Sequence, residues 1–204
     1  MSRPSSKGGL GLTGWAFRAI VATLAIAGLS QLWTKPTPLP AAPIVSRNDA
    51  RMPVVPGMSA PPGLKPGQVR SLLNVPGRLR YGDFRWNDTG VPSGRILIRV
   101  DRRAQILSVF RDGHEIGTAV ILYGAPEKPT PAGTYPVLGK ALYHRSATYN
   151  ADMPFTLWLT DDGVAIHGSR VRDGAATHGC VGLPEDFARK LFHEVHPGDP
   201  VVIV

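Results

Sequence analysis

Residues 96–123 read ILIRVDRRAQILSVFRDGHEIGTAVILY, and this stretch decides the fold. Apolar side chains alternate along residues 96–100, and a charged turn follows at residues 101–103. Residues 105–111 are a second apolar run. Asp112-Gly113 separates that run from a third at residues 115–123, and an Asp-Gly pair between two apolar runs is a strong hairpin signal. The stretch therefore predicts three successive strands, of which the last two form a hairpin.

The remainder of the C-terminal half is expected to be extended apart from one helix. The further strands are expected at residues 134–138, 155–160, 164–166 and 200–204. Pro184 suits the first position of a helix, and the apolar residues between Phe187 and Val195 have helical spacing. Pro197-Gly198 then ends the helix. The sequence predicts a mainly β domain with one helix near its C-terminal end.

The first 34 residues have the composition of an export signal. Basic residues precede an apolar run at residues 19–29, and no acidic residue appears before Asp49. This pattern is typical of a secretory signal rather than of a buried helix. Because no good processing site follows the run, we expect residues 1–34 to be an uncleaved anchor in the inner membrane, with a cleaved signal peptide as the alternative. Both place the rest of the chain outside the cytoplasm, in the periplasm or the cell envelope.

Residues 35–92 are predicted to form a proline-rich, basic linker. They hold eleven of the 20 prolines, a composition that favours an extended, semi-rigid chain. The formal net charge of +8 comes from residues 1–90, because residues 91–204 carry twelve basic and twelve acidic side chains. A neutral domain at residues 93–204 argues against nucleic acid as a partner. The linker either follows an anionic membrane or wall surface or is simply solvated, and its apolar end near residues 70–86 can pack on the domain.

The chain has one cysteine, Cys180, which lies thirteen residues after His167 in the run Thr177-His178-Gly179-Cys180. Exported proteins usually hold cysteines as disulfides, so an unpaired one is a candidate nucleophile. A cysteine attacks acyl carbons as a thiolate, and a neighbouring imidazole can take its proton. We favour His167 over His178 as this base, because His167 ends a predicted strand and can approach the thiol from across the site. Gly179 lets a carbonyl oxygen reach the backbone N–H groups of Gly179 and Cys180, which are natural oxyanion donors.

These residues resemble the active-site signature of the L,D-transpeptidases, bacterial enzymes that remodel peptidoglycan by way of a cysteine. The resemblance covers residues 93–204 and rests on the runs IHG (166–168), THGCV (177–181), PTPAGTY (129–135), MPF (153–155) and GDPVVI (198–203). It implies the family's fold, a β-sandwich or barrel-like domain with one helix near the C-terminal end. It also implies that no cofactor and no metal takes part.

The resemblance assigns a role to each residue of the signature. Cys180 matches the nucleophile, His167 the general base and His178 a supporting histidine. The backbone carbonyl of Gly168 would orient the base, and Thr177 matches the serine or threonine before the second histidine. The implied substrate is a peptidoglycan stem peptide, cleaved between its third residue, a diamino acid, and the terminal D-alanine. An acceptor stem peptide would then take the acyl group and form a cross-link, whereas water would make the same site an L,D-carboxypeptidase.

One departure from the family concerns substrate binding. The family usually has arginine two residues after the cysteine, and Gly182 stands there in this chain. Arg170 and Arg172, in the loop between the two histidines, are candidate replacements, although exposed loop charges are the plainer interpretation. Thr177 and Tyr143 are further candidates for substrate binding, the latter in a long aromatic segment that is either a lid or an ordinary loop.

Two other interpretations of the signature stay open. Gly182 is compatible with a catalytically idle module that binds peptidoglycan. His167, His178 and Cys180 are also competent zinc ligands, so a zinc-dependent peptidase is the other alternative. No H-x-x-x-H or C-x-x-C pair supports it.

Overall fold

The computed structural model describes residues 51–204 except residues 56 and 174, so the predicted export signal lies outside the described residues. An eight-stranded sheet has the strand order β1-β2-β6-β5-β4-β12-β7, and β3 pairs with β6 beside this path. Its strands are β1 (Arg51–Pro53), β2 (Ser71–Leu73), β3 (Phe84–Trp86), β4 (Ile96–Asp101), β5 (Ile106–Arg111), β6 (His114–Val120), β7 (Gly133–Pro136) and β12 (Pro200–Ile203).

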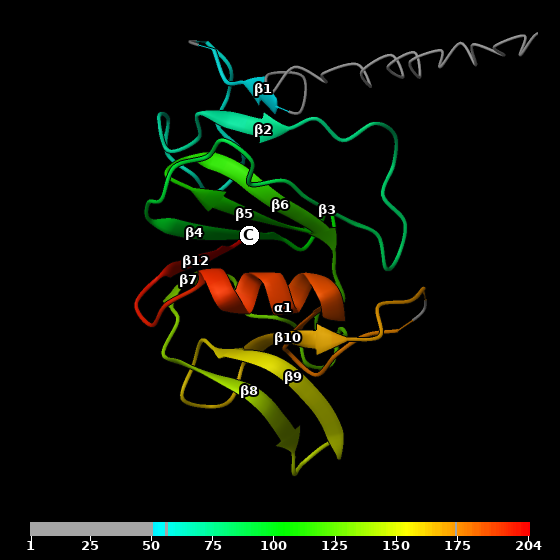
Figure 1. Ribbon diagram of the computed structural model, residues 1–204. Coiled ribbons are helices and arrows are strands. Elements are labelled where there is room, and N and C mark those ends of the chain that lie inside the picture. Colours follow the sequence, from blue (N-terminus) through cyan, green and yellow to red (C-terminus); the bar gives the residue numbers. More distant parts are fainter. Residues whose placement is uncertain (1–50, 56, 174) are drawn as a thin grey trace, which may run out of the picture. The chain divides into compact units, whose positions relative to one another are not determined.

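A second, four-stranded sheet has the order β11-β10-β9-β8. Its strands are β8 (Gly139–Ser146), β9 (Ala151–Trp158), β10 (Ala165–Ser169) and β11 (Val181–Pro184), and the helix α1 (Glu185–Glu194) follows β11 directly. Figure 1 shows α1 between the larger sheet and the strands β8 to β10. The predicted fold class is confirmed: the protein is mainly β with one helix, and its two sheets form a sandwich rather than a closed barrel.

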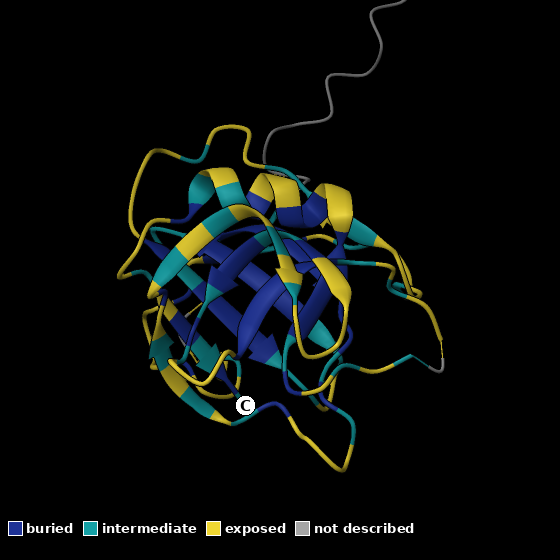
Figure 2. Cartoon of the chain, turned by 90° about the horizontal axis from the view of Figure 1, so that it is seen from below, coloured by how far each residue is buried: buried dark blue, intermediate teal, exposed yellow. Residues whose placement is uncertain are grey.

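The predicted hairpin is the centre of the larger sheet. Strands β5 and β6 pair antiparallel, and the turn residues Asp112 and Gly113 have φ values of 47° and 81°. Positive φ at both central residues is what a tight type I′ hairpin turn needs, and Asp-Gly tolerates it. Figure 2 shows the central strands buried throughout, whereas α1 exposes one side to solvent. The apolar alternation in the sequence therefore corresponds to a core shared by both sheets and α1.

The helix was also predicted from its ends. Pro184 immediately precedes α1, and Glu185 and Asp186 lie in the first turn, where acidic side chains complement the helix dipole. Its buried face contains Phe187, Ala188 and Leu191. Strand β8 was not among the expected strands, because both of its faces are largely exposed and its sequence lacks apolar alternation.

The segment before residue 93 contributes strands to the folded domain. Arg51 in β1 donates hydrogen bonds from its guanidinium to the carbonyls of Glu115 and Asn87. The buried Glu115 carboxylate accepts a hydrogen bond from the backbone N–H of Leu73 in β2, at 2.8 Å. Residues 51–92 thus hold part of the larger sheet, whereas their prolines alone indicated an extended linker.

The indole of Trp86 in β3 is partly buried and packs against the core. It packs edge-to-face on Phe187 of α1, with ring centroids 5.3 Å apart. The backbone of β6 can approach the indole because residue 117 is glycine: a methyl group added there would lie 2.5 Å from a ring carbon of Trp86. The β3 strand is therefore fitted to both β6 and the helix.

Among the residues that the structure describes, no helix is long and apolar enough to cross a membrane. The predicted anchor lies outside this range.

The substitution Trp86→Ala tests whether residues 51–92 belong to the cooperative fold. Losing the partly buried indole should lower the free energy of unfolding by about 3 kcal/mol, within the usual range for a large aromatic side chain. Urea denaturation followed by circular dichroism measures the loss. Arg85→Ala is the matched control, because Arg85 lies in the same strand with an exposed side chain. Equal stability of the two variants would contradict the packing role of β3.

Candidate active site

Parallel pairing of β10 with β11 brings the two halves of the cysteine signature together. Ile166 lies opposite Val181, and His167 lies opposite Gly182. Cys180 immediately precedes β11, so this register places it beside the first residues of β10. Its thiol lies 3.7 Å from the carbonyl oxygen of Gly163, to which it donates. His167 in β10 and Cys180 immediately before β11, thirteen residues apart in sequence, are therefore brought to neighbouring parts of one sheet.

The imidazole of His167 is buried and held by the backbone. Only 8% of the residue is exposed, and Nδ1 lies 2.8 Å from the carbonyl oxygen of Gly168. A carbonyl oxygen only accepts hydrogen bonds, so Nδ1 carries the proton and donates it. The other ring nitrogen, Nε2, is then the unprotonated one and can accept a proton. A backbone carbonyl thus orients this histidine in the way a carboxylate does in a hydrolytic triad.

Burial favours the uncharged forms of both groups. It raises the pKa of the Cys180 thiol above its ordinary value of 9.0; a backbone hydrogen bond from Ala165 and the charge of Lys128 lower it in part, while the charge of Asp162 raises it. Burial also lowers the pKa of His167 below its ordinary 6.5, against the hydrogen bond to Gly168. The site at neutral pH therefore contains a thiol and a neutral imidazole rather than a preformed ion pair.

Two threonines hold the backbone of Cys180 in place. The hydroxyl of Thr177 donates to the carbonyl oxygen of Cys180 at 2.5 Å, and that of Thr130 does so at 3.4 Å. The backbone N–H of Thr177 donates to the carbonyl of Tyr123 at 3.0 Å. Thr130 is fully buried and also accepts a hydrogen bond from the backbone N–H of Gly124 at 2.8 Å. The turn after β6 and the loop before β11 are thus joined at Cys180.

His178 lies on the outer side of the site. Its ring stacks on that of Tyr149, with centroids 4.1 Å apart and an angle of 16° between the planes. Tyr149 lies in the turn that joins β8 to β9. Gly179, between His178 and Cys180, has a φ of 106°, a conformation that favours glycine.

Among the remaining candidates for substrate binding, Tyr143, Arg170 and Arg172 form no described contact with Cys180 or His167. Tyr143 is 63% exposed, and its hydroxyl donates to Asp152 of the same hairpin at 2.7 Å. Arg170 and Arg172 are exposed in the loop after β10, and neither forms an ion pair with another described residue. Thr177 uses its hydroxyl on the backbone of Cys180. The sequence interpretation assigned no role in the site to Thr130 or Lys128, although Thr130 belongs to the run PTPAGTY quoted for the resemblance and Lys128 precedes it.

Gly182 is enclosed by its neighbours. Its backbone exchanges two hydrogen bonds with Leu122, each of 2.9 Å. A methyl group added at residue 182 would lie 3.0 Å from Oγ of Ser169 and 3.3 Å from Cβ of Leu122. A larger side chain would require these residues to shift. Glycine at position 182, opposite His167, therefore fits the space that Ser169 and Leu122 leave.

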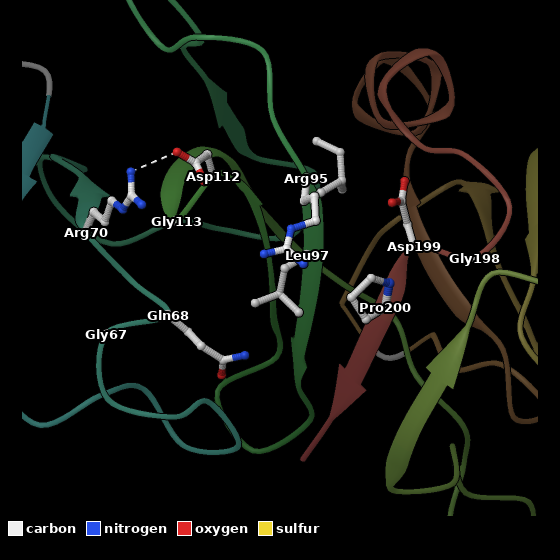
Figure 3. Close-up of a pocket in the computed structure, with 11 residues that line it drawn as sticks. Gly67, Gln68, Arg70, Arg95, Leu97, Asp112, Gly113, Gly198, Asp199 and Pro200 are labelled. Atoms are coloured by element: carbon white, nitrogen blue, oxygen red, sulfur yellow. Dashed lines mark hydrogen bonds and ion pairs between the residues drawn. The ribbon is translucent and has the colours of Figure 1, made fainter.

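No metal-binding cluster is found in the described part of the chain: no three side chains among its histidines, cysteines and acidic residues lie so that they could hold an ion. Two surface cavities are lined by residues outside this site. One of about 520 Å³ is lined by residues from β4, the β5–β6 turn and the turn before β12, with Arg70 paired to Asp112 at its rim (Figure 3). Another, of about 570 Å³, is lined by Arg51, Ser71 and His114 among others.

Comparison with known proteins agrees with this architecture. The family model YkuD, described as the L,D-transpeptidase catalytic domain, matches residues 95–203. This is more than half of the chain, and the protein belongs to that family.

Relatives of known name support the same assignment. "L,D-transpeptidase 1" of Mycobacterium tuberculosis (strain ATCC 25618 / H37Rv) is 29% identical over 133 residues, which are 56% of this chain and 53% of the relative. "Probable L,D-transpeptidase 3" of the same strain is 27% identical over 106 residues, 44% of this chain and 39% of the relative. The chain thus spans about half the length, or less, of the curated relatives it matches.

Solved structures resemble the fold over a similar range. An L,D-transpeptidase from Mycobacterium smegmatis has a TM-score of 0.50 and 25% identity, with 54% of this chain and 58% of that chain covered. LD transpeptidase LdtMt1 in complex with imipenem has the same TM-score and identity, with 53% and 58% covered.

The raised pKa of the thiol predicts how Cys180 reacts with a neutral alkylating agent. The rate of alkylation by iodoacetamide should stay low between pH 6 and 8 and rise through an inflection above 9.0, because only the thiolate reacts. Intact mass follows the reaction without ambiguity, since Cys180 is the one cysteine. N-acetylcysteine is the control for the reagent. A plateau of fast reaction near pH 6 would show an ion pair with His167 and contradict the neutral pair.

The hydrogen bond from the Thr177 hydroxyl to the Cys180 carbonyl predicts different effects of two substitutions at Thr177. Thr177→Val removes the hydroxyl that donates to that carbonyl and should slow acylation of Cys180 about tenfold, because the nucleophile loses its fixed position. Thr177→Ser keeps the hydroxyl and should react at nearly the rate of the unchanged protein. Stopped-flow fluorescence with an acylating β-lactam measures both rates. If Thr177→Val reacts as fast as the unchanged protein, or no slower than Thr177→Ser, the hydroxyl does not position Cys180.

Proposed function

We propose that the protein is a cysteine-dependent L,D-transpeptidase that acts on peptidoglycan stem peptides and forms cross-links through a thioester on Cys180. The observation that carries this proposal is the pairing of β10 with β11, which sets Cys180 level with Ala165, two residues before His167, while the carbonyl of Gly168 accepts a hydrogen bond from the imidazole. Membership of the L,D-transpeptidase family supports it.

The first half-reaction forms the thioester. His167 Nε2 takes the thiol proton while Sγ adds to the carbonyl carbon between the diamino acid at position three of the donor and its terminal D-alanine. The backbone N–H groups of Gly179 and Cys180 are the proposed donors to the resulting oxyanion. When the tetrahedral intermediate collapses, the C–N bond breaks, and the protonated His167 gives its proton to the amine of D-alanine.

The second half-reaction transfers the acyl group. An amine of an acceptor stem peptide attacks the thioester carbonyl, His167 accepts its proton, and the C–S bond breaks to leave a thiolate that is reprotonated. Because both groups begin and end uncharged, the low pKa of His167 and the high pKa of Cys180 suit a cycle in which the proton moves only during reaction. Water in place of the amine would give an L,D-carboxypeptidase.

The proposed location follows from the N-terminal sequence. We place the catalytic domain in the periplasm or the cell envelope, tethered to the inner membrane if residues 1–34 stay uncleaved. No cofactor or metal is part of the proposed reaction.

Covalent labelling and product analysis test the proposal on the full chain. Incubation with imipenem should add one molecule per chain by intact mass; Cys180→Ala should abolish the adduct, and His167→Gln should slow its formation at least about 100-fold, the usual contribution of a general base. With a disaccharide-tetrapeptide as substrate, chromatography and mass spectrometry should show released D-alanine and a cross-linked dimer.

The alternatives give different results in the same experiments. Released D-alanine without a dimer would indicate the carboxypeptidase. A chain that forms no adduct and releases no D-alanine would be the idle binding module, and activity lost to a chelator in the absence of an adduct would indicate a zinc peptidase. Each of these outcomes would overturn the proposed transpeptidase.

A further inference from the structure

Lys128 lies beside the catalytic loop. It belongs to the turn-rich segment between β6 and β7, and its side chain runs along Gly179: a methyl group added at Gly179 would lie 3.9 Å from Cγ of Lys128. The ammonium group donates to the hydroxyl of Tyr149 at 3.3 Å and lies 5.8 Å from the centre of that ring. An exposed lysine thus lies beside Gly179 and Tyr149, next to the loop that carries Cys180.

The position of the ammonium group depends on three segments that are distant in sequence. Lys128 comes from the turn after β6, and Tyr149 comes from the turn between β8 and β9. Tyr149 in turn stacks on His178, two residues before the nucleophile, with ring centroids 4.1 Å apart. The Lys128–Tyr149–His178 assembly therefore connects a cation to the loop that carries Cys180.

The charge of Lys128 is not neutralised by the protein. It forms no ion pair with any described residue. It is also the one cation in the described part of the chain whose charge lowers the pKa of Cys180, which Asp162 raises. Gly182 provides no side chain near His167. An anionic group of a bound substrate would therefore find its nearest counter-charge at Lys128.

We propose that Lys128 binds the free carboxylate of the residue that leaves, and so restricts Cys180 to the last peptide bond of its donor. The inference rests on the proposed function. In a donor that ends with the leaving residue, the terminal carboxylate lies one residue beyond the carbonyl that Sγ attacks, within about 3.6 Å of chain. A lysine ammonium binds such a group as a point charge without needing a fixed bidentate geometry.

A longer donor would present a neutral peptide group at the same place. It would lose the charge-assisted hydrogen bond, which is stronger than one between neutral groups. Lys128 is therefore a specificity residue that distinguishes a terminal residue from an internal one, and Tyr149 is a positioning residue that acts through it.

The cation is tested first without any substrate. Cys180 of the full chain is alkylated with iodoacetate, an anion, and with iodoacetamide, its neutral counterpart; in both reactions the thiolate displaces iodide. Lys128→Met should lower the ratio of the iodoacetate rate to the iodoacetamide rate about three- to fivefold at low salt, the effect of one exposed charge pair. Lys128→Arg should restore this ratio. Lys190→Met, which removes an exposed lysine from α1, is the matched control and should leave the ratio unchanged. An unchanged ratio in Lys128→Met would overturn the proposal.

Specificity is then tested with matched donors. The unchanged protein should have a kcat/KM at least about tenfold higher for a tetrapeptide with a free carboxylate than for its carboxamide, and Lys128→Met should lose this preference mainly through KM. Tyr149→Phe keeps the ring that stacks on His178 but removes the hydroxyl that holds Lys128, so it should lose part of the preference. If Lys128→Met keeps the full preference for the carboxylate donor over the carboxamide, Lys128 does not bind the carboxylate.

The two experiments separate failure of this inference from failure of the proposed function. If neither donor is turned over by the unchanged protein, the proposed function fails, and the alkylation ratio still decides whether Lys128 attracts an anion to Cys180. If both donors are turned over equally by the unchanged protein, the function stands and the carboxylate site is refuted.

Discussion

Strands β10 and β11 pair in parallel, with His167 opposite Gly182, and every other feature of the site is arranged around this ladder. Parallel neighbours cannot be joined by a tight turn, so the chain must leave the sheet after β10 and return before β11. The returning loop carries Thr177, His178, Gly179 and Cys180. The register of the sheet thereby places Cys180 level with Ala165, two residues before the buried His167.

Burial gives the site its chemical character. It disfavours both the thiolate of Cys180 and the imidazolium of His167, which favours a neutral resting pair. In the proposed reaction the proton moves as the bond to the substrate forms. Lys128 acts in the opposite sense, because its charge favours the thiolate. The hydroxyls of Thr130 and Thr177 are occupied by the backbone of Cys180. Few polar groups near the nucleophile are then left to contact a substrate, and Lys128 is among them.

The basic segment before residue 93 takes part in the fold. Arg51 is bound to backbone carbonyls, and Arg70 pairs with Asp112 at the β5–β6 turn. Some of the positive charge that the composition assigned to a linker therefore lies on the surface of the larger sheet. Three short strands of this segment, β1, β2 and β3, pair within the larger sheet, which a composition typical of a linker does not reveal.

Local patterns in the sequence predicted the β5–β6 hairpin and the helix, and they indicated Cys180 and His167 as the candidate nucleophile and base, because turn chemistry, apolar periodicity and a short motif are local properties of the chain. Only the tertiary structure decided that Thr130 holds the Cys180 carbonyl, that Gly182 is enclosed by Ser169 and Leu122, and that Lys128, Tyr149 and His178 meet. Those contacts join residues from separate strands and loops. Their positions follow from strand pairing and register, which no local pattern in the sequence encodes.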